Sequence, residues 1–227
     1  MSEVMLITST KQNREDFSKA MIHESIINYD IKALPIASIV DHTGPIADAY
    51  NRYLSADYLD KYLVFMHADS QIKAPKLEQE LEEAFLLYDV IGVAGSTKEF
   101  PEDVSWFFTV KEHHVMRKDP MYLSGNVFHT DPRCYGPSFF GPAPQPCEML
   151  DGVFLAVNGA TVIPTGIRFD PQFKYDFYDL DFCRQARAVG LRLGTWPFKL
   201  THASGGRFGS LEWQAALKLY KSKWNSS

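Results

Sequence analysis

The sequence predicts an α/β fold in which a central, mostly parallel sheet is flanked by helices. Short apolar runs rich in β-branched and aromatic residues alternate with segments of helical hydrophobic spacing through the first 95 residues. The 227 residues suffice for one large α/β domain with a real core. Polar residues follow the ends of several apolar runs, where open α/β sheets bind their ligands.

The charge and the cysteine content argue against a nucleic-acid-binding protein and against a disulfide-stabilised one. The net charge is −5 and no basic block occurs, so we expect no nucleic-acid partner. The three cysteines, Cys134, Cys147 and Cys183, have no CxxC spacing, and an odd number does not fit a disulfide framework. They predict reduced thiols. The chain shows no signal-peptide pattern and no apolar run that could span a bilayer, so we expect a soluble, cytoplasmic protein.

The first half of the chain predicts four strands separated by helices. Apolar residues at helical spacing predict each connecting helix, and Pro75 fits a helix start. Because the order is strand, helix, strand, the strands are expected to be parallel. The predicted strands are 4–8, 34–40, 62–66 and 89–95, and the predicted helices are 15–29, 46–58 and 75–87.

The periodicity fails between residues 96 and 149, apart from an expected strand at 106–110. Residues 131–147 contain too many prolines and glycines for a regular element. Their aromatic residues argue against disorder, so this stretch predicts a lid or binding loop. Periodicity then returns, and it predicts a strand at 149–157, a helix from Asp179 that ends at Gly190, a strand at 191–196, a polar Gly-rich stretch at 200–206 and a final helix at 210–224.

The final predicted helix carries a stripe of large apolar residues. Core packing is the favoured interpretation of this stripe, and a homodimer contact or a membrane-peripheral contact is the alternative. The acidic total charge argues against the membrane contact. The stripe consists of Trp213, Leu217, Tyr220 and Trp224.

A candidate metal site follows the strand at 62–66. His67 and Asp69 are two residues apart, so an extended chain would project both side chains from one side, just past the carboxyl end of the strand. An imidazole and a carboxylate there could hold a divalent cation, which in turn could hold phosphate oxygens. The alternative is that Asp69 and Ser70 only cap a turn before the next helix.

Three further acidic residues are candidates for a site. Asp41 ends the second strand and could accept hydrogen bonds from a ribose or a base, or it could be a solvated loop residue. Asp151 could form a turn with Gly152 or could face a cleft. Asp179 stands at a helix start, where an acidic residue is ordinarily a cap.

Together these segments resemble family 2 glycosyltransferases with the GT-A fold, and in particular a short bacterial subgroup. The resemblance implies transfer of a sugar from a nucleoside diphosphate sugar, most commonly a UDP-sugar, to a hydroxyl acceptor such as a glycan, with inversion at the anomeric carbon. It also implies a divalent cation, Mn²⁺ or Mg²⁺. The residues that carry it are Asp41, Ala49-Tyr50-Asn51, Phe65-Met66-His67-Ala68-Asp69, Asp151 to Ala156, Phe177 to Cys183 and His202 to Gly205.

The resemblance also implies roles for individual residues. Asp179 matches the catalytic base, and His67 and Asp69 match the DxD motif, with His202 matching a histidine that completes the metal site. The residues expected to bind the donor nucleotide are Thr8, Asp41, Asn51, His67 and Asp69. Those expected to contact the sugar or the acceptor are Asp151, Gly152 and Tyr178.

The implied organisation is one GT-A domain over residues 1–206 followed by a C-terminal helix within 207–227. Residues 1–95 would form a nucleotide-binding half, and residues 96–206 an acceptor half that contains the lid 131–147.

Two positions depart from the family pattern. His67 replaces the first aspartate of the DxD motif, and Tyr178 replaces the glutamate of a Glu-Asp pair. A catalytically silent nucleotide-sugar-binding module is therefore an alternative to an enzyme. A nucleotidyltransferase is disfavoured, because no Gly-rich, Lys-containing phosphate loop follows the first strand.

Overall fold

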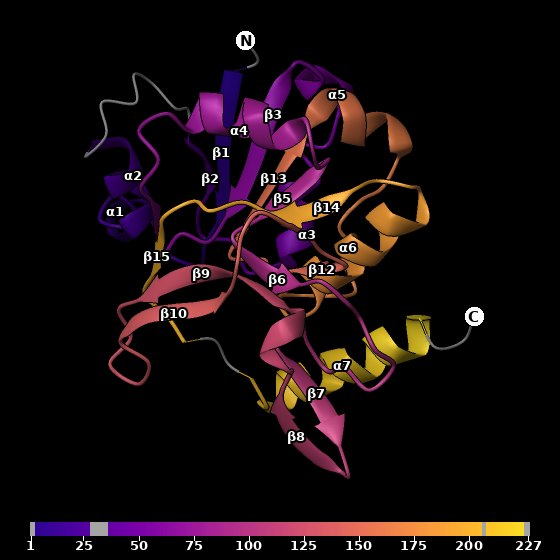
Figure 1. The fold of residues 1–227 in the computed structure, drawn as a ribbon. Helices are drawn as coiled ribbons and strands as arrows, with labels where there is room; N and C mark the ends of the chain where they lie inside the picture. Colours follow the sequence, from indigo (N-terminus) through magenta and orange to yellow (C-terminus); the bar gives the residue numbers. More distant parts are fainter. Residues whose placement is uncertain (1–2, 28–35, 206–207, 225–227) are drawn as a thin grey trace.

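The computed structural model describes residues 3–27, 36–205 and 208–224, and its largest sheet is mostly parallel (Figure 1). This sheet has the order β11-β14-β5-β13-β3-β1-β2, in which only β11 and β13 run against the other strands. The predicted α/β fold class is therefore confirmed. The strands are β1 (Glu3–Ser9), β2 (Ile36–Ile39), β3 (Lys61–Met66), β5 (Val90–Gly92), β11 (Gln145–Pro146), β13 (Phe154–Asn158) and β14 (Leu193–Thr195).

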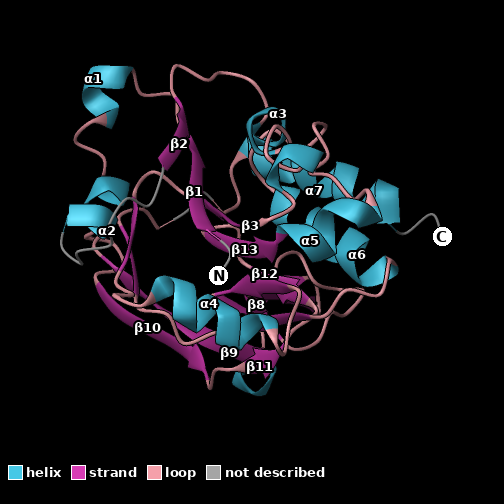
Figure 2. Cartoon of the chain, turned by 90° about the horizontal axis from the view of Figure 1, so that it is seen from above, coloured by secondary structure: helices cyan, strands magenta, loops and turns pink. Residues whose placement is uncertain are grey.

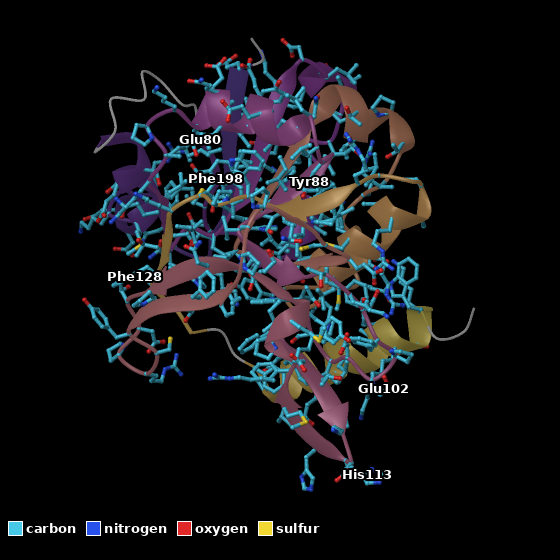
Figure 3. The ribbon with its side chains drawn as sticks, viewed as in Figure 1. Glu80, Tyr88, Glu102, His113, Phe128 and Phe198 are labelled. Carbon is cyan, nitrogen blue, oxygen red and sulfur yellow. The ribbon has the colours of Figure 1, made fainter. Side chains whose placement is uncertain are left out.

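A second sheet has the order β12-β6-β9-β15-β4, with β10 paired to β9. The hairpin of β7 (Phe108–Lys111) and β8 (His114–Arg117) projects from the body, with His113 at its tip (Figure 3). The strands of the second sheet are β4 (Ser70–Ile72), β6 (Ala94–Ser96), β9 (Leu123–His129), β10 (Gly136–Gly141), β12 (Met149–Leu150) and β15 (Leu200–His202).

The chain passes from one sheet to the other at short polar or glycine-containing segments. Residues 67–69 join β3 to β4, and residues 151–153 join β12 to β13. These two crossings are neighbours, because β13 pairs with β3 and the His67 N–H donates to the Val153 carbonyl at 3.2 Å. The fold thus brings the predicted metal motif beside the predicted Asp151 turn.

Helices cover both faces of the large sheet (Figure 2). The side chains of β3 alternate between two cores, as expected for a strand buried on both faces. Leu63 and Phe65 pack with α3 and α6, whereas Val64 and Met66 pack with α4. The helices are α1 (Arg14–Phe17), α2 (Glu24–Ile27), α3 (Ile46–Tyr50), α4 (Leu77–Phe85), α5 (Gly159–Val162), α6 (Tyr178–Ala188) and α7 (Leu211–Trp224).

Two predicted helices are shorter than expected. The helix predicted at 15–29 is divided into α1, a 3-10 turn at Met21–His23 and α2, because Ala20 is extended and interrupts the helical hydrogen bonds. Residues 28–29 lie outside the described part, as do 34–35 of the second predicted strand. The helix predicted at 46–58 ends at Tyr50, and only a 3-10 turn at Ala56–Tyr58 follows.

The prediction that residues 131–147 contain no regular element is wrong. This stretch contains β10, which pairs with β9, and the short strand β11. Pro137 is tolerated because β10 pairs on one side only, so the missing N–H costs no ladder bond there. The strands predicted at 89–95 and 149–157 are each divided, at Val93 and at residues 151–153, where the chain changes sheet.

Helix α7 packs on the core, as its apolar stripe predicted. The Tyr220 hydroxyl donates to Glu99 at 3.0 Å, and the Trp224 indole donates to Asp181 at 2.8 Å. The Lys223 ammonium lies 2.7 Å from the same carboxylate, which is fully buried on α6. Helix α7 is thus fastened to α6 by charge as well as by packing. Within the described ranges, no helix has the length and apolar character to cross a bilayer.

Candidate active site

A cleft of about 850 Å³ opens where the crossings between the sheets meet the start of α6. Its lining includes a group of polar residues, called here the polar wall, and a group of aromatic side chains, most of them in contact with one another, called here the aromatic wall. Six of the residues that the sequence singled out line the polar wall, namely His67, Asp151, Gly152, Tyr178, Asp179 and His202.

His67 lies directly after β3 with its ring between two tyrosines. Its Nε2 is 3.1 Å from the Tyr178 hydroxyl, and its Nδ1 is 3.5 Å from the Tyr175 hydroxyl. The His202 ring lies 5.6 Å away, centroid to centroid. Burial, followed by the nearby charge of His202, lowers the pKa of His67 to about 4. His67 is therefore neutral at physiological pH, as a metal ligand must be.

Asp69 and His202 are brought together by β4 and β15. These strands pair with His202 opposite Ser70, and the Ala203 N–H donates to the Asp69 carbonyl at 2.9 Å. The Asp69 carboxylate then lies 3.5 Å from His202 Nε2. Burial opposes ionisation of Asp69, but the contact with His202 outweighs it and lowers the pKa of Asp69 well below its usual range. Asp69 is an ionised ligand candidate.

His67, Asp69 and His202 form a candidate metal centre. One potential ligand atom from each residue lies within 4.8 Å of the other two. The set offers two imidazole nitrogens and one carboxylate oxygen, which suits Mn²⁺, Fe²⁺, Co²⁺ or Zn²⁺ better than Mg²⁺, because magnesium prefers oxygen ligands alone. The side chains present therefore fit a divalent transition metal.

Asp179 stands in the first turn of α6, and backbone donors hold its carboxylate. The Gly152 N–H donates to Oδ2 at 2.8 Å and the Leu180 N–H donates to Oδ1 at 2.9 Å. Burial, and then the negative charge of Asp151, raise the pKa of Asp179 to about 7, although the two N–H bonds oppose the shift. A carboxylate with this pKa can gain and lose a proton near neutral pH.

Asp151 orients an indole that forms part of the aromatic wall. Its Oδ2 accepts from Trp106 Nε1 at 2.8 Å, and its Oδ1 accepts from the Val153 N–H at 2.8 Å. Trp106 packs edge-on against Phe140, with ring centroids 4.9 Å apart. The other aromatic residues of the wall are Phe107, Phe108, Phe139, Phe208 and Trp213. Flat apolar surfaces of this kind can receive the faces of sugar rings.

Four of the five predicted donor-binding residues do not line the cleft. One of them, Asp69, contacts the lining residue His202. The other three lie away from the metal centre. Thr8 is fully buried in β1, and its hydroxyl finds no hydrogen-bond partner among the described residues. The side-chain amide of Asn51 is committed to the Phe169 backbone, accepting from its N–H at 2.9 Å and donating to its carbonyl at 2.8 Å. Asp41 is exposed after β2, in a left-handed backbone conformation.

Sequence reasoning missed several residues of the cleft. Tyr175 contacts His67, and the His129 ring lies 5.9 Å from His202. Trp106 was predicted only as part of a strand. Tyr175 lies two residues before Phe177, and His129 lies at the end of β9. The only available signal was that polar and aromatic residues gather at strand ends and helix starts, which is too common to select them.

Comparison with known proteins gives a family that matches the sequence and solved structures that have a similar fold. A sequence model described as a glycosyltransferase-like family matches residues 7–200. None of the curated proteins matches the chain. Among solved structures, A197 from STIV is 11% identical with a TM-score of 0.52, and the match covers 89% of this chain and 86% of A197. At this identity the likeness shows the fold alone.

Two other solved structures align with TM-scores below 0.5. TarS 1-349 from S. aureus is 11% identical with a TM-score of 0.49, over 88% of this chain and 60% of TarS. The mannosyltransferase PcManGT from Pyrobaculum calidifontis, in complex with GDP-Man and Mn²⁺, is 14% identical with a TM-score of 0.46. That match covers 91% of this chain and 58% of PcManGT, so the chain spans less than two thirds of either protein.

Proposed function

The chain belongs to the glycosyltransferase-like family and is therefore a glycosyltransferase, and we propose that it transfers a sugar from a nucleoside diphosphate sugar to a hydroxyl acceptor, with inversion, in the cleft described above. One observation supports this most strongly. A carboxylate with a pKa near neutrality, Asp179, shares the cleft with two residues of the candidate metal centre, His67 and His202. Inverting transfer requires a base and a positive centre in one place.

Asp179 acts as the base in this proposal. Its carboxylate removes the proton of the acceptor hydroxyl while the acceptor oxygen attacks the anomeric carbon, and the bond to the diphosphate breaks on the opposite side. The N–H donors of Gly152 and Leu180 fix the carboxylate before the acceptor arrives. A divalent cation held by His67, Asp69 and His202 would supply positive charge for the departing diphosphate.

The aromatic wall is proposed to hold the acceptor. Trp106 keeps its ring orientation through the hydrogen bond to Asp151. Each carboxylate oxygen of Asp151 can accept a second hydrogen bond, for example from a sugar hydroxyl. Residues 96–206 supply Trp106 and Phe140, which fits an acceptor half. We also propose that residues 1–95, with Thr8, Asp41 and Asn51, form the nucleotide-binding half. This part is supported by the resemblance to family 2 glycosyltransferases.

The cellular setting is also a proposal. Cys134, Cys147 and Cys183 are all free thiols, which fits a reducing compartment such as the cytoplasm. We also propose that the chain belongs to a bacterial GT-A subgroup and forms a homodimer.

A screen of nucleotide sugars by thermal unfolding tests the donor and the metal together. We expect a UDP-sugar to stabilise the protein, by about 2.7 kcal/mol at a hundred times its Kd. Stabilisation should be larger with Mn²⁺ than with Mg²⁺, because two of the three ligand atoms are imidazole nitrogens. Equal effects of the two metals would contradict the mixed donor set. Stabilisation by no nucleotide sugar, with or without either metal, would contradict donor binding.

The rate of transfer should rise with pH up to about 7. Asp179 must be ionised to act as a base, and its pKa is raised to about 7, so kcat should fall about tenfold per pH unit below that value and level off above it. A pH–rate profile under saturating donor measures this. A rate that is flat across the acidic range would show that another group is the base.

The same shift affects stability in the opposite direction. Between the usual pKa of 3.8 and about 7, the folded protein holds a proton on Asp179 that the unfolded chain has lost. The contribution of this group to the free energy of unfolding therefore decreases as pH rises through that window. Urea unfolding at several pH values separates this effect from the rate profile.

A further inference from the structure

The two residues that depart from the family pattern contact each other. His67 follows β3 and Tyr178 begins α6, yet His67 Nε2 lies 3.1 Å from the Tyr178 hydroxyl oxygen. Tyr178 is only 2% exposed, so protein groups, with little access of water, decide the direction of its hydrogen bonds. The two residues therefore form one hydrogen-bonded pair.

The proton of this hydrogen bond belongs to His67. The Tyr178 hydroxyl lies 2.8 Å from the Gly152 carbonyl oxygen, which can only accept. The Tyr178 hydroxyl has a single hydrogen, and it donates this hydrogen to the Gly152 carbonyl. The phenol oxygen then faces His67 as an acceptor, so His67 Nε2 must carry a hydrogen. A neutral imidazole protonated at Nε2 has its one lone pair at Nδ1.

The other nitrogen of His67 is less firmly engaged. Nδ1 lies 3.5 Å from the hydroxyl of Tyr175, a long contact made by a side chain that is 42% exposed. A metal ion takes only an unprotonated nitrogen. With Nε2 protonated, Nδ1 is the nitrogen that can serve.

We propose that Tyr178 is a positioning residue that holds His67 as the Nε2–H tautomer and so makes Nδ1 the metal-binding atom. This inference rests on the metal centre in the proposed function and goes beyond it by assigning the ligand atom and the residue that selects it. Carboxylates at these two positions could not form the same pair of hydrogen bonds. A carboxylate at position 178 has no proton for the Gly152 carbonyl, and a carboxylate at position 67 has no N–H for the phenol.

A matched pair of variants tests the role of Tyr178. Tyr178→Phe removes the hydroxyl that accepts from Nε2, and Tyr175→Phe removes the hydroxyl next to Nδ1. Calorimetric titration of the metal-free protein with Mn²⁺ should show about 10–100-fold weaker binding for Tyr178→Phe, the usual effect of losing such a partner. Tyr175→Phe removes only the long contact at Nδ1, so its affinity for Mn²⁺ should fall less than that of Tyr178→Phe. Equal loss in both variants, or loss in Tyr175→Phe alone, would overturn the proposal.

The parent protein gives a test that does not depend on a variant folding. Long-range proton–nitrogen spectra of the metal-free protein, with histidine labelled by nitrogen-15, should show the Nε2–H tautomer for His67. After loading with cadmium-113, the metal should couple to Nδ1 of His67. Coupling to Nε2 would overturn the assignment.

Asp69→Asn separates failure of this inference from failure of the metal centre itself. If the parent and Asp69→Asn bind Mn²⁺ equally, or neither binds it, the centre is wrong and the inference falls with it. If Asp69→Asn loses affinity while Tyr178→Phe keeps it, the centre stands and only the role of Tyr178 is overturned.

Discussion

Replacing Asp179 with asparagine should lower kcat for sugar transfer by about 10²–10⁴-fold, the usual contribution of a general base. The variant keeps the shape of the side chain but cannot take up the acceptor proton. Binding of the donor, measured by its thermal stabilisation of the variant, should be retained. The comparison of kcat with donor affinity therefore isolates the proton transfer.

Two controls separate a loss of proton transfer from a loss of folding or a general effect of removing a carboxylate. In Asp179→Asn the amide nitrogen faces the N–H of either Gly152 or Leu180, so the unfolding temperature of the variant must be compared with that of the parent. Asp57→Asn changes an exposed carboxylate on the turn at Ala56–Tyr58 and should leave kcat unchanged. Full activity of folded Asp179→Asn would remove Asp179 from the mechanism.

Replacing Asp69 with asparagine should abolish most of the stabilisation by Mn²⁺. The amide carries no charge, so the centre loses its only anionic ligand among His67, Asp69 and His202. We expect the affinity for Mn²⁺ to fall by at least about 10–100-fold, the loss that is typical when a hydrogen-bond partner of a metal ligand is removed. Each tenfold loss lowers the stabilisation at saturating metal by about 1.4 kcal/mol. Calorimetric titration of the metal-free protein gives the affinity directly.

Asp41→Asn is the matched control for this experiment. Asp41 is exposed and outside the metal centre, and asparagine tolerates its left-handed backbone conformation. Its affinity for Mn²⁺ should equal that of the parent. If both variants weaken Mn²⁺ binding equally, the metal is held elsewhere.

The sequence predicted the large sheet because its strands depend on local pattern. The run from Tyr62 to Met66 is apolar on both faces and can be satisfied only in a buried strand. The helix at 15–29 was overpredicted for the opposite reason. Helical spacing predicts which residues would share a face of a helix. It does not predict that Ala20 adopts an extended conformation, with which Phe17 and Ile22 are both buried in the core.

The candidate site was predictable in part because strand ends converge in an α/β sheet. His67 and Asp151 meet through the pairing of β3 with β13, and His202 meets Asp69 through the pairing of β4 with β15. No local pattern could predict the contact of His67 with Tyr178, which are 111 residues apart. Nor could it predict that the amide of Asn51 serves the Phe169 backbone, 118 residues away.

The fastening of α7 to α6 has a consequence for the base. Asp181 lies one residue beyond Leu180, whose N–H holds Asp179, and its carboxylate is kept in a water-free setting by Lys223 and Trp224. Removing such a partner from a buried charge costs about 3–5 kcal/mol. We therefore expect that loss of the contacts made by Lys223 and Trp224 would displace the start of α6, and with it the carboxylate of the proposed base Asp179. The last described turn of α7 would then affect the rate of transfer although none of its residues lines the cleft.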